Sequence, residues 1–365
     1  MKTFPLSALN ALALPSSPFV AVLPMPSYPA SFSRTASPET PLVTILSVNY
    51  NQAEVTRALL SSLRAVTYPR TEVIVVDNGS PTPGQAAAIA AGFPDVHVIA
   101  HPSNDGFAGG NNVGIRVAQG DYVLLLNNDT EVEPGFLEPL VAAMEADPSL
   151  GLASPKIRYH HTPDTIQYAG CGPIDPLTMR GHVTGHNEVD RGQHDASGIT
   201  DLGHGAALLI RRTVLEEVGL LPALYFLYYE EHDFAAHVAR AGWRVAYVAE
   251  SVVYHKESMT VGKENALKTY YMTRNRLLYL RRNVHGATFW LALAFVLGVA
   301  LPKRTLVLLA RRRFDLLSAL WRGTLWHLGR LGHRPTMHGL PQFEGGNERR
   351  KEGTEAQALE RALPA

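Results

Sequence analysis

The sequence has little cysteine and no net charge, and each feature limits what the chain can be. Cys171 is the only cysteine among 365 residues, so no internal disulfide can form, which fits a reducing compartment. The formal net charge is zero, but residues 256–334 contain 15 Lys and Arg against 3 Asp and Glu. This basic region predicts contact with an anionic membrane surface or with nucleic acid. No nucleic-acid-binding motif accompanies it, so we favour the membrane.

The sequence also lacks an apolar run of the length that spans a bilayer, about 20 residues. The longest run covers residues 287–301, is flanked by basic residues and is followed by Pro302. We expect the run to end at Pro302 and to form a membrane-interface or re-entrant helix, with a buried core helix as the alternative. Residues 302–334 mix leucines and two tryptophans with arginines, which is typical of an amphipathic helix on an anionic leaflet.

The composition divides the chain into four predicted parts. Residues 1–40 are rich in Pro and Ser and contain short apolar stretches, so we expect a disordered extension rather than a secretory signal. Residues 41–285 form the predicted folded domain. A membrane-associating helical segment over 286–335 and a polar, disordered tail over 336–365 complete the prediction.

Apolar strands and short helices alternate from residue 42 onward. The pattern predicts strands over 42–48, 71–77, 95–100 and 122–126, and helices over 54–65, 85–92, 108–120 and 134–147. This alternation predicts an α/β fold with a mostly parallel central sheet and helices on both faces. Further on, we expect long loops over 156–200 that line an acceptor site, then helices over 230–242 and 264–283.

Polar side chains follow three of the predicted strands: Tyr50 after the first, Asp77 after the second, and Asn127, Asn128 and Asp129 after the fourth. In such sheets ligands bind outside the carboxyl ends of the strands. Asp129 offers the oxygen ligands that Mg²⁺ or Mn²⁺ prefers; the alternative is a helix N-cap. Asp77 suits a nucleobase or ribose hydroxyl, and its alternative is an Asx-turn.

Two further stretches carry weaker signals of a site. The glycine-rich segment 104–114 precedes a helix and permits close approach to an anion, although it matches neither the dinucleotide fingerprint nor the P-loop. Glu231 precedes an apolar stripe on the predicted helix 230–242, so it should point toward the protein. Asp233, on the other stripe, should be solvated. Alternatively, Glu230 and Glu231 only complement the helix dipole.

Taken together, these motifs resemble the family 2 glycosyltransferases, especially the rhamnosyltransferase-like and galactofuranosyltransferase-like branch. The resemblance runs in order from about residue 42 to 283 and rests on "VTILSVNYN", "EVIVVDNGS", "NDGFAGGNNVGI", "GDYVLLLNNDTEVEPGFL", "LLIRRTVLEEVG", "YYEEHDFAAHVARAGWRVAYVAESVVYH" and "YYMTRNRLLYL". It implies the nucleotide-diphospho-sugar transferase fold called GT-A, followed here by C-terminal amphipathic helices.

The resemblance also implies roles for individual residues. Asp129, in "NND", stands at the metal-binding acid of the family's D-x-D-like motif, and His255 matches a histidine that completes the metal shell in some members. Glu231 takes the place of the catalytic base, with Glu where the family has Asp, and Asn127 replaces the motif's first acid. The residues expected to bind the nucleotide sugar are Tyr50, Asp77, Asn104, Asn112, Asn127, Asn128 and Arg274, the last near the diphosphate.

The resulting hypothesis is an inverting, Mg²⁺- or Mn²⁺-dependent sugar transfer from a nucleotide-diphospho-sugar to a hydroxyl of a glycan or lipid-linked acceptor. We expect a cytoplasmic protein, peripheral on the inner face of the cell membrane, that serves cell-surface polysaccharide synthesis and binds no nucleic acid. A nucleotidyltransferase that makes the sugar nucleotide is one alternative. A non-catalytic glycan-binding scaffold on the same fold is the other.

Overall fold

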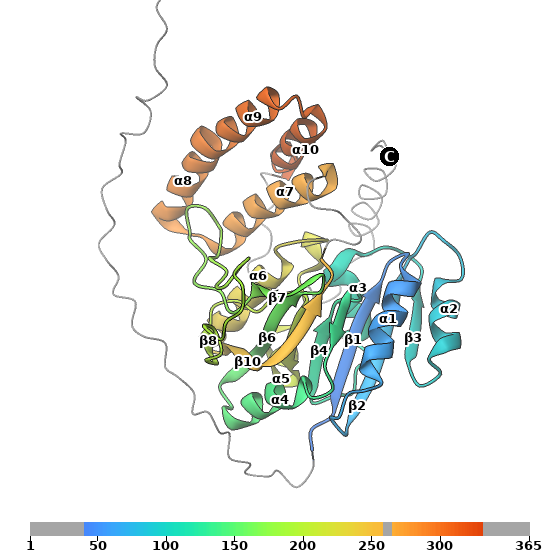
Figure 1. Cartoon of the computed structure of the whole chain (residues 1–365). Helices are drawn as coiled ribbons and strands as arrows, with labels where there is room; N and C mark the ends of the chain where they lie inside the picture. Colours follow the sequence, from blue (N-terminus) through green and yellow to red (C-terminus); the bar gives the residue numbers. More distant parts are fainter. Residues whose placement is uncertain (1–39, 258–264, 331–365) are drawn as a thin grey trace, which may run out of the picture.

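The computed structural model describes residues 40–257 and 265–330 as one α/β unit with a helical layer above it (Figure 1). The predicted extension over 1–40 and tail over 336–365 lie almost entirely outside the described residues. The strands are β1 (Val43–Asn49), β2 (Thr71–Asn78), β3 (His97–His101), β4 (Tyr122–Leu126), β5 (Thr130–Val132), β6 (Leu150–Tyr159), β7 (Thr162–Tyr168), β8 (Gly198–Thr200), β9 (Ala207–Arg211) and β10 (Arg244–His255).

The strands form one sheet in the order β3-β2-β1-β4-β9-β6-β10-β5, with β7 paired to β6 and β8 to β10. The strands β1, β2, β3, β4, β6 and β10 run in the same direction, while β9 lies antiparallel between β4 and β6. The sheet is thus mostly parallel, as the alternating pattern predicts. The carboxyl ends of β1, β2, β4 and β10 therefore meet at one edge.

Helices cover both faces of the sheet, because alternate strand residues point to opposite sides. On β4, Leu124 packs with helices α1 (Ala53–Leu63), α2 (Gln85–Gly92) and α4 (Leu137–Ala146). Its neighbour Leu125 belongs to the opposite core, with α3 (Gly106–Ile115), α5 (Arg212–Val218) and α6 (Glu230–Arg240). The uninterrupted apolar run of β4 is the consequence of burial on both faces.

Two local expectations are wrong. The stretch predicted as loops over 156–200 contains the end of β6 and the whole of β7 and β8, and only residues 169–197 between them are irregular. The weak periodicity arises because β6 is buried almost throughout and so shows no polar alternation.

Asp233, expected in solvent, is fully buried, because Arg282 on the neighbouring helix α7 (Ala266–Asn283) binds its carboxylate at 2.9 Å.

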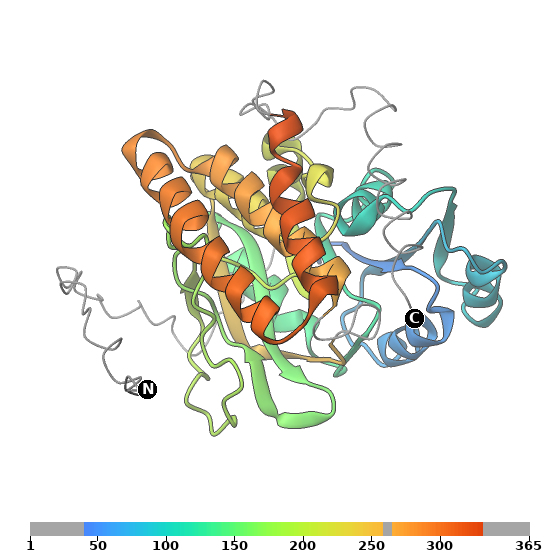
Figure 2. The same ribbon diagram turned by 90° about the horizontal axis from the view of Figure 1, so that it is seen from above.

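The C-terminal helices, α8 (Gly286–Phe295), α9 (Leu301–Ala310) and α10 (Phe314–Leu325), lie over α7 (Figure 2). The expectation that the apolar helix ends at Pro302 is wrong: the π-helical turn Val296–Ala300 joins α8 and α9 into a continuous helix. In that turn Leu301 N–H donates to Val296 O, five residues back, and this wider turn accommodates the proline, which has no N–H. The joined helix Gly286–Ala310 is long and apolar enough to cross a membrane.

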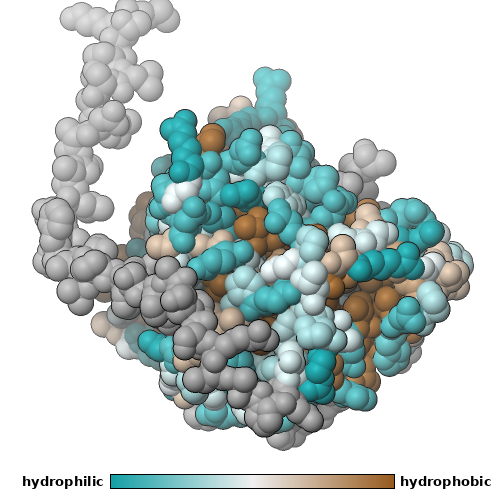
Figure 3. Space-filling model, turned by 60° about the horizontal axis from the view of Figure 1, so that its bottom comes forward, coloured by the Kyte–Doolittle hydropathy of each residue, from teal (hydrophilic) through white to brown (hydrophobic). Residues whose placement is uncertain are grey.

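Most of this joined helix is exposed. Only 22% of its most apolar window is buried, which is at odds with the core-helix alternative. Ten of the fourteen large apolar side chains that are exposed in the described residues belong to 286–330, including Trp290 at 67% and Leu306 at 66%. On the bottom face of the molecule, by contrast, hydrophilic and apolar residues are interspersed (Figure 3).

The Asp233–Arg282 ion pair should contribute strongly to stability, since it joins α6 to α7 without solvent exposure. Asp233→Ala should lower the free energy of unfolding by about 3–5 kcal/mol, because it leaves the buried Arg282 guanidinium without its carboxylate partner. Urea denaturation measures the loss. Asp164→Ala, which removes an exposed carboxylate, is the control and should change stability by less than about 0.5 kcal/mol. Equal effects would contradict a structural role for the pair.

Candidate active site

A cavity of about 470 Å³ opens at the edge where the parallel strands end. Its walls come from the ends of β1, β4 and β10, the N-terminus of α3, the segment before β9, and the turn that leads into α6. The following predicted site residues line it: Tyr50, Asn104, Asn127, Asn128, Asp129, Glu231 and His255. The fold thus brings together residues that are up to 205 positions apart in the sequence.

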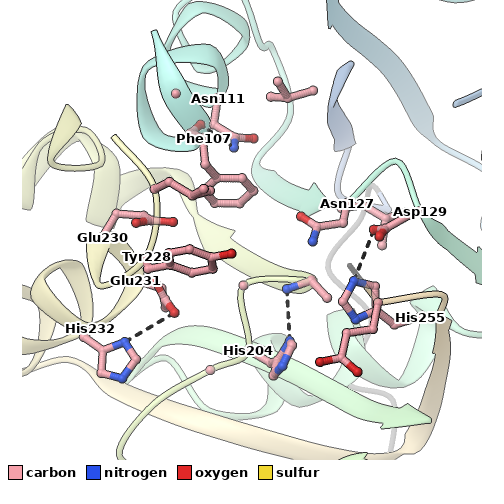
Figure 4. A pocket seen from close by; sticks show the side chains of 18 of the residues that line it. Phe107, Asn111, Asn127, Asp129, His204, Tyr228, Glu230, Glu231, His232 and His255 are labelled. Atoms are coloured by element: carbon pink, nitrogen blue, oxygen red, sulfur yellow. Dashed lines mark hydrogen bonds and ion pairs between the residues drawn. The ribbon is translucent and has the colours of Figure 1, made fainter. Parts of the chain in front are cut away.

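Asp129 and His255 form one polar pair in the cavity (Figure 4). The Nε2 atom of His255 lies 3.1 Å from Asp129 Oδ1, and both residues are buried. The other ring nitrogen, Nδ1, lies 2.8 Å from the Gln167 side-chain oxygen. Gln167 therefore orients the imidazole with Nε2 toward the carboxylate, the arrangement in which a polar partner behind a histidine supports metal binding.

The carboxylate of Asp129 and the imidazole of His255 fit a divalent cation of the Mg²⁺ or Mn²⁺ type. A carboxylate oxygen and an imidazole nitrogen suit Mn²⁺ well. Within the described ranges, no group of three or more His, Cys, Asp or Glu side chains is arranged to hold a metal ion by itself. A cation here would need further oxygen ligands from water or from a phosphate-bearing substrate, as is usual for Mg²⁺.

Glu230 and Glu231 form a second polar pair, at the N-terminus of α6. Burial and the adjacent Glu231 raise the pKa of Glu230 well above its usual value. Burial acts in the same direction on Glu231, but His232, with Nδ1 3.3 Å from Glu231 Oε1, outweighs it and lowers the pKa of Glu231. The two carboxyl groups therefore differ in acidity: Glu230 keeps its proton to a higher pH than Glu231, which is ionised at neutral pH.

The side chain of Glu231 is only partly buried, at 21% exposed, and reaches the cavity. Among the residues that the structure describes, Glu231 Oε2 has no hydrogen-bond partner. An ionised carboxylate that lines a cavity and has an unsatisfied oxygen is able to accept a proton from a bound hydroxyl group.

His204 is a cavity residue that the sequence reasoning missed. Its Nδ1 accepts a hydrogen bond from Ala206 N–H at 3.1 Å, so its Nε2 carries the proton. Burial lowers the pKa of His204 to about 3, and the neighbouring His255 adds to the effect. His204 is thus neutral, and in Figure 4 it lies between the Glu231–His232 and Asp129–His255 pairs. A histidine just before a strand was its only sequence signal.

Three predicted residues do not line the cavity. Asp77 accepts a hydrogen bond from Asn49 at 2.9 Å and is linked to the site through it. Asn112 forms two hydrogen bonds with the backbone of Leu221, at 2.8 and 3.0 Å, so its amide is used within the fold. Its neighbour Asn111 lines the cavity instead.

Arg274, expected near a diphosphate, is instead 1% exposed. Its guanidinium donates to the backbone oxygens of Leu224 and Tyr225, at 2.8 and 2.7 Å. The structure therefore places Arg274 beneath the turn that leads to Glu231, outside the lining of the cavity. The expectation from the resemblance did not foresee this burial, which depends on how α7 packs.

The sequence is similar to those of known glycosyltransferases. Residues 44–219 match the model of glycosyl transferase family 2, a range that ends before Glu231 and His255. The N-acetylglucosaminyl-diphospho-decaprenol L-rhamnosyltransferase of Mycobacterium tuberculosis is 26% identical over 249 residues, covering 62% of this chain and 80% of that protein. The low-salt glycan biosynthesis hexosyltransferase Agl10 of Haloferax volcanii is 25% identical, covering 65% and 74%.

Among solved structures, the fold is similar to the mannosyltransferase PcManGT from Pyrobaculum calidifontis in complex with GDP-Man and Mn²⁺. The TM-score is 0.51 and the identity 17%, covering 80% of this chain and 88% of that one. At this identity the similarity establishes the GT-A fold and no more. The fold expected from the sequence motifs is thereby confirmed.

Proposed function

Because residues 44–219 match the model of glycosyl transferase family 2 and the relatives named above are sugar transferases, we propose that this chain transfers a sugar with inversion from a nucleoside-diphosphate sugar to a hydroxyl of a glycan or lipid-linked acceptor. One observation carries the proposal: the side chains of Asp129, His255 and Glu231 line the same cavity. The family match argues against the nucleotidyltransferase alternative, and the presence of Asp77, Asp129, Glu231 and His255 argues against a non-catalytic scaffold.

In the proposed mechanism, Glu231 is the general base. It removes the proton from the acceptor hydroxyl as the oxygen attacks the anomeric carbon, on the face opposite to the leaving nucleoside diphosphate. The C–O bond to the diphosphate breaks as the new glycosidic bond forms. The nearby His232 lowers the pKa of Glu231 and so favours its ionised form, which is the state that a base requires.

Asp129 and His255 would hold a divalent cation, Mg²⁺ or Mn²⁺, with Gln167 orienting His255. Such a cation, when bound, neutralises the charge that develops on the leaving diphosphate. Tyr50, Asn104, Asn127 and Asn128 line the remainder of the cavity and offer hydrogen bonds to the donor. Asp77 would bind the base or ribose beside the cavity, as the family resemblance implies.

The proposal that the acceptor is linked to a lipid is based on the C-terminal helices. Their exposed apolar side chains and the basic run Arg311–Arg313 suit an anionic membrane surface. Lys303 and Arg304 occur in the second half of the joined helix, where a spanning arrangement would carry them into hydrocarbon at a cost. We therefore propose peripheral binding on the inner, cytoplasmic face, with a polyprenyl-linked acceptor, as the name of the mycobacterial relative suggests.

Replacement of the proposed base tests the mechanism. Glu231→Gln should lower turnover by about 10²–10⁴-fold, because the amide cannot accept the proton, while binding of the nucleotide sugar is retained. Release of nucleoside diphosphate from a panel of UDP-, dTDP- and GDP-sugars, with N-acetylglucosaminyl-diphospho-polyprenol as acceptor, measures turnover.

Glu230→Gln is the matched control, because it makes the same change at the adjacent acid, which has no assigned role in the proton transfer; turnover should fall much less. His232→Gln should move the acidic limb of the rate profile to higher pH. Histidine lowers the pKa of Glu231, so without it the base becomes protonated at a higher pH as the solution is acidified. Full turnover in Glu231→Gln would remove this residue from the mechanism.

The metal site predicts that Mn²⁺ and nucleoside diphosphate stabilise the protein together. The thermal midpoint should rise by several degrees when both are in large excess over their dissociation constants, and EDTA should abolish the rise. Asp129→Asn should remove the Mn²⁺-dependent part, and Gln167→Leu should weaken Mn²⁺ binding by about 10–100-fold, as for other residues behind a ligand. Asp315→Asn, on α10, is the control. An unchanged Mn²⁺ effect in Asp129→Asn would refute the assignment.

Membrane binding is tested best by point substitutions, since truncation also removes residues that pack on α7. The triple variant Trp290→Ser, Leu291→Ser and Leu306→Ser should release the protein from vesicles that contain anionic phospholipid, because it removes exposed apolar area. Co-sedimentation measures binding. The control replaces Val117 and Leu177, which are exposed elsewhere at 43% and 40%, with serine. Equal binding by both variants would contradict a membrane role for these helices.

A further inference from the structure

Two adjacent residues of α7 bind the backbone of the 224–228 turn, which precedes the glutamate pair. Asn275 donates to the backbone oxygens of Tyr225, Leu227 and Tyr228 at 2.9, 2.7 and 2.8 Å. Arg274 donates to those of Leu224 and Tyr225 at 2.8 and 2.7 Å. Arg274 is 1% exposed and Asn275 fully buried, so these are hydrogen bonds shielded from water, where an unsatisfied carbonyl is costly.

The turn that they bind is strained. Phe226, Tyr228 and Tyr229 have φ angles of 63°, 69° and 74°, in the left-handed region that bulky side chains rarely adopt. Such residues persist only where their surroundings enforce the conformation, and they cluster at functional sites. Here the enforcing groups are the amide of Asn275 and the guanidinium of Arg274.

The strained residues lead directly into the glutamate pair. Tyr229 is the N-cap residue of α6, and Glu230 and Glu231 follow it as the first two helical residues. The direction in which Glu231 leaves the backbone therefore depends on the φ angles of Tyr228 and Tyr229. On its other side, the turn contacts the start of α3: Phe107 N–H donates to Phe226 O at 2.7 Å.

Helix α10 and the residues after it support the same part of α7. His327 Nε2 donates to Arg274 O at 2.8 Å, and the Trp326 ring lies 4.9 Å from the Arg274 guanidinium carbon. At Gly323 an added Cβ would lie 2.7 Å from Tyr270 O, so only glycine permits this close approach. Arg274 and Asn275 are thus held between the turn and the C-terminal helices.

We propose that Arg274 and Asn275 are positioning residues, which hold the strained 224–228 turn so that Glu231 lies at the acceptor hydroxyl. This inference rests on the proposed role of Glu231 as the base. It assigns Arg274 to the backbone of the turn in place of the donor diphosphate. A purely structural role would reduce stability alone, whereas positioning predicts a loss of kcat in folded protein with little change in the KM for the donor.

The experiment compares Asn275→Leu with Leu140→Ala, a fully buried residue of α4 on the opposite face of the sheet. Both full-length variants are assayed below their unfolding transitions, with thermal midpoints measured in parallel. Asn275→Leu should lower kcat by about 100-fold, the effect of a displacement of roughly 1 Å in a catalytic group. Its donor KM should stay within about threefold, and Leu140→Ala should change kcat by less than about threefold.

If Asn275→Leu does not fold, Asn275→Ser decides, since its hydroxyl retains one donor; kcat should then fall about 10-fold at unchanged donor KM. A kcat in the folded Asn275 variant equal to that of Leu140→Ala would overturn the inference. Glu231→Gln, assayed in the same experiment, distinguishes a failure of the positioning role from a failure of the base assignment. If it loses turnover while Asn275 variants do not, only the positioning role fails; if it keeps turnover, the base assignment itself fails.

Discussion

The site depends on the parallel pairing of β1 with both β2 and β4. In this register Asn49 lies opposite Asp77, and the end of β4 brings the amides and carboxylate of 127–129 to the same edge. A chain of hydrogen bonds joins these ends: Asn128 donates to Thr56, Thr56 to Asn49, and Asn49 to Asp77. Each of these hydrogen bonds is buried or partly buried, so water does not readily replace a lost partner. A shift of one strand would therefore break this series of hydrogen bonds together with the pairing of the sheet.

The electrostatics of the cavity depend on two adjacent acidic residues, Glu230 and Glu231, which begin helix α6. Burial raises the pKa of both Glu230 and Glu231, so the difference between them comes from their neighbours: His232 lowers the pKa of Glu231, whereas the adjacent Glu231 raises the pKa of Glu230 by more than Arg274 lowers it. The result is one carboxyl group with a raised pKa and one with a lowered pKa. Separating two acids in this way is a common means of obtaining a base at neutral pH.

Helix α7 connects the cavity with the C-terminal helices. Its first residues, Leu267 and Lys268, line the cavity, its middle binds the strained turn, and its outer side packs on α10. The apolar surface that we assign to the membrane is therefore built on the same helix that supports the proposed base. An acceptor presented at that surface would lie close to the cavity without a separate binding domain.

The sequence by itself determined the alternation of strands and helices, the polar residues after β1, β2 and β4, and the acids at the start of α6, because these depend on local periodicity and on the rule that ligands bind at strand ends. Tertiary structure decided the rest. The position of His204 depends on β9 running antiparallel, which puts the start of that strand at the edge where the others end. The burial of Asp233 and Arg274 depends on how α7 packs, and no local pattern encodes a partner about 50 residues away.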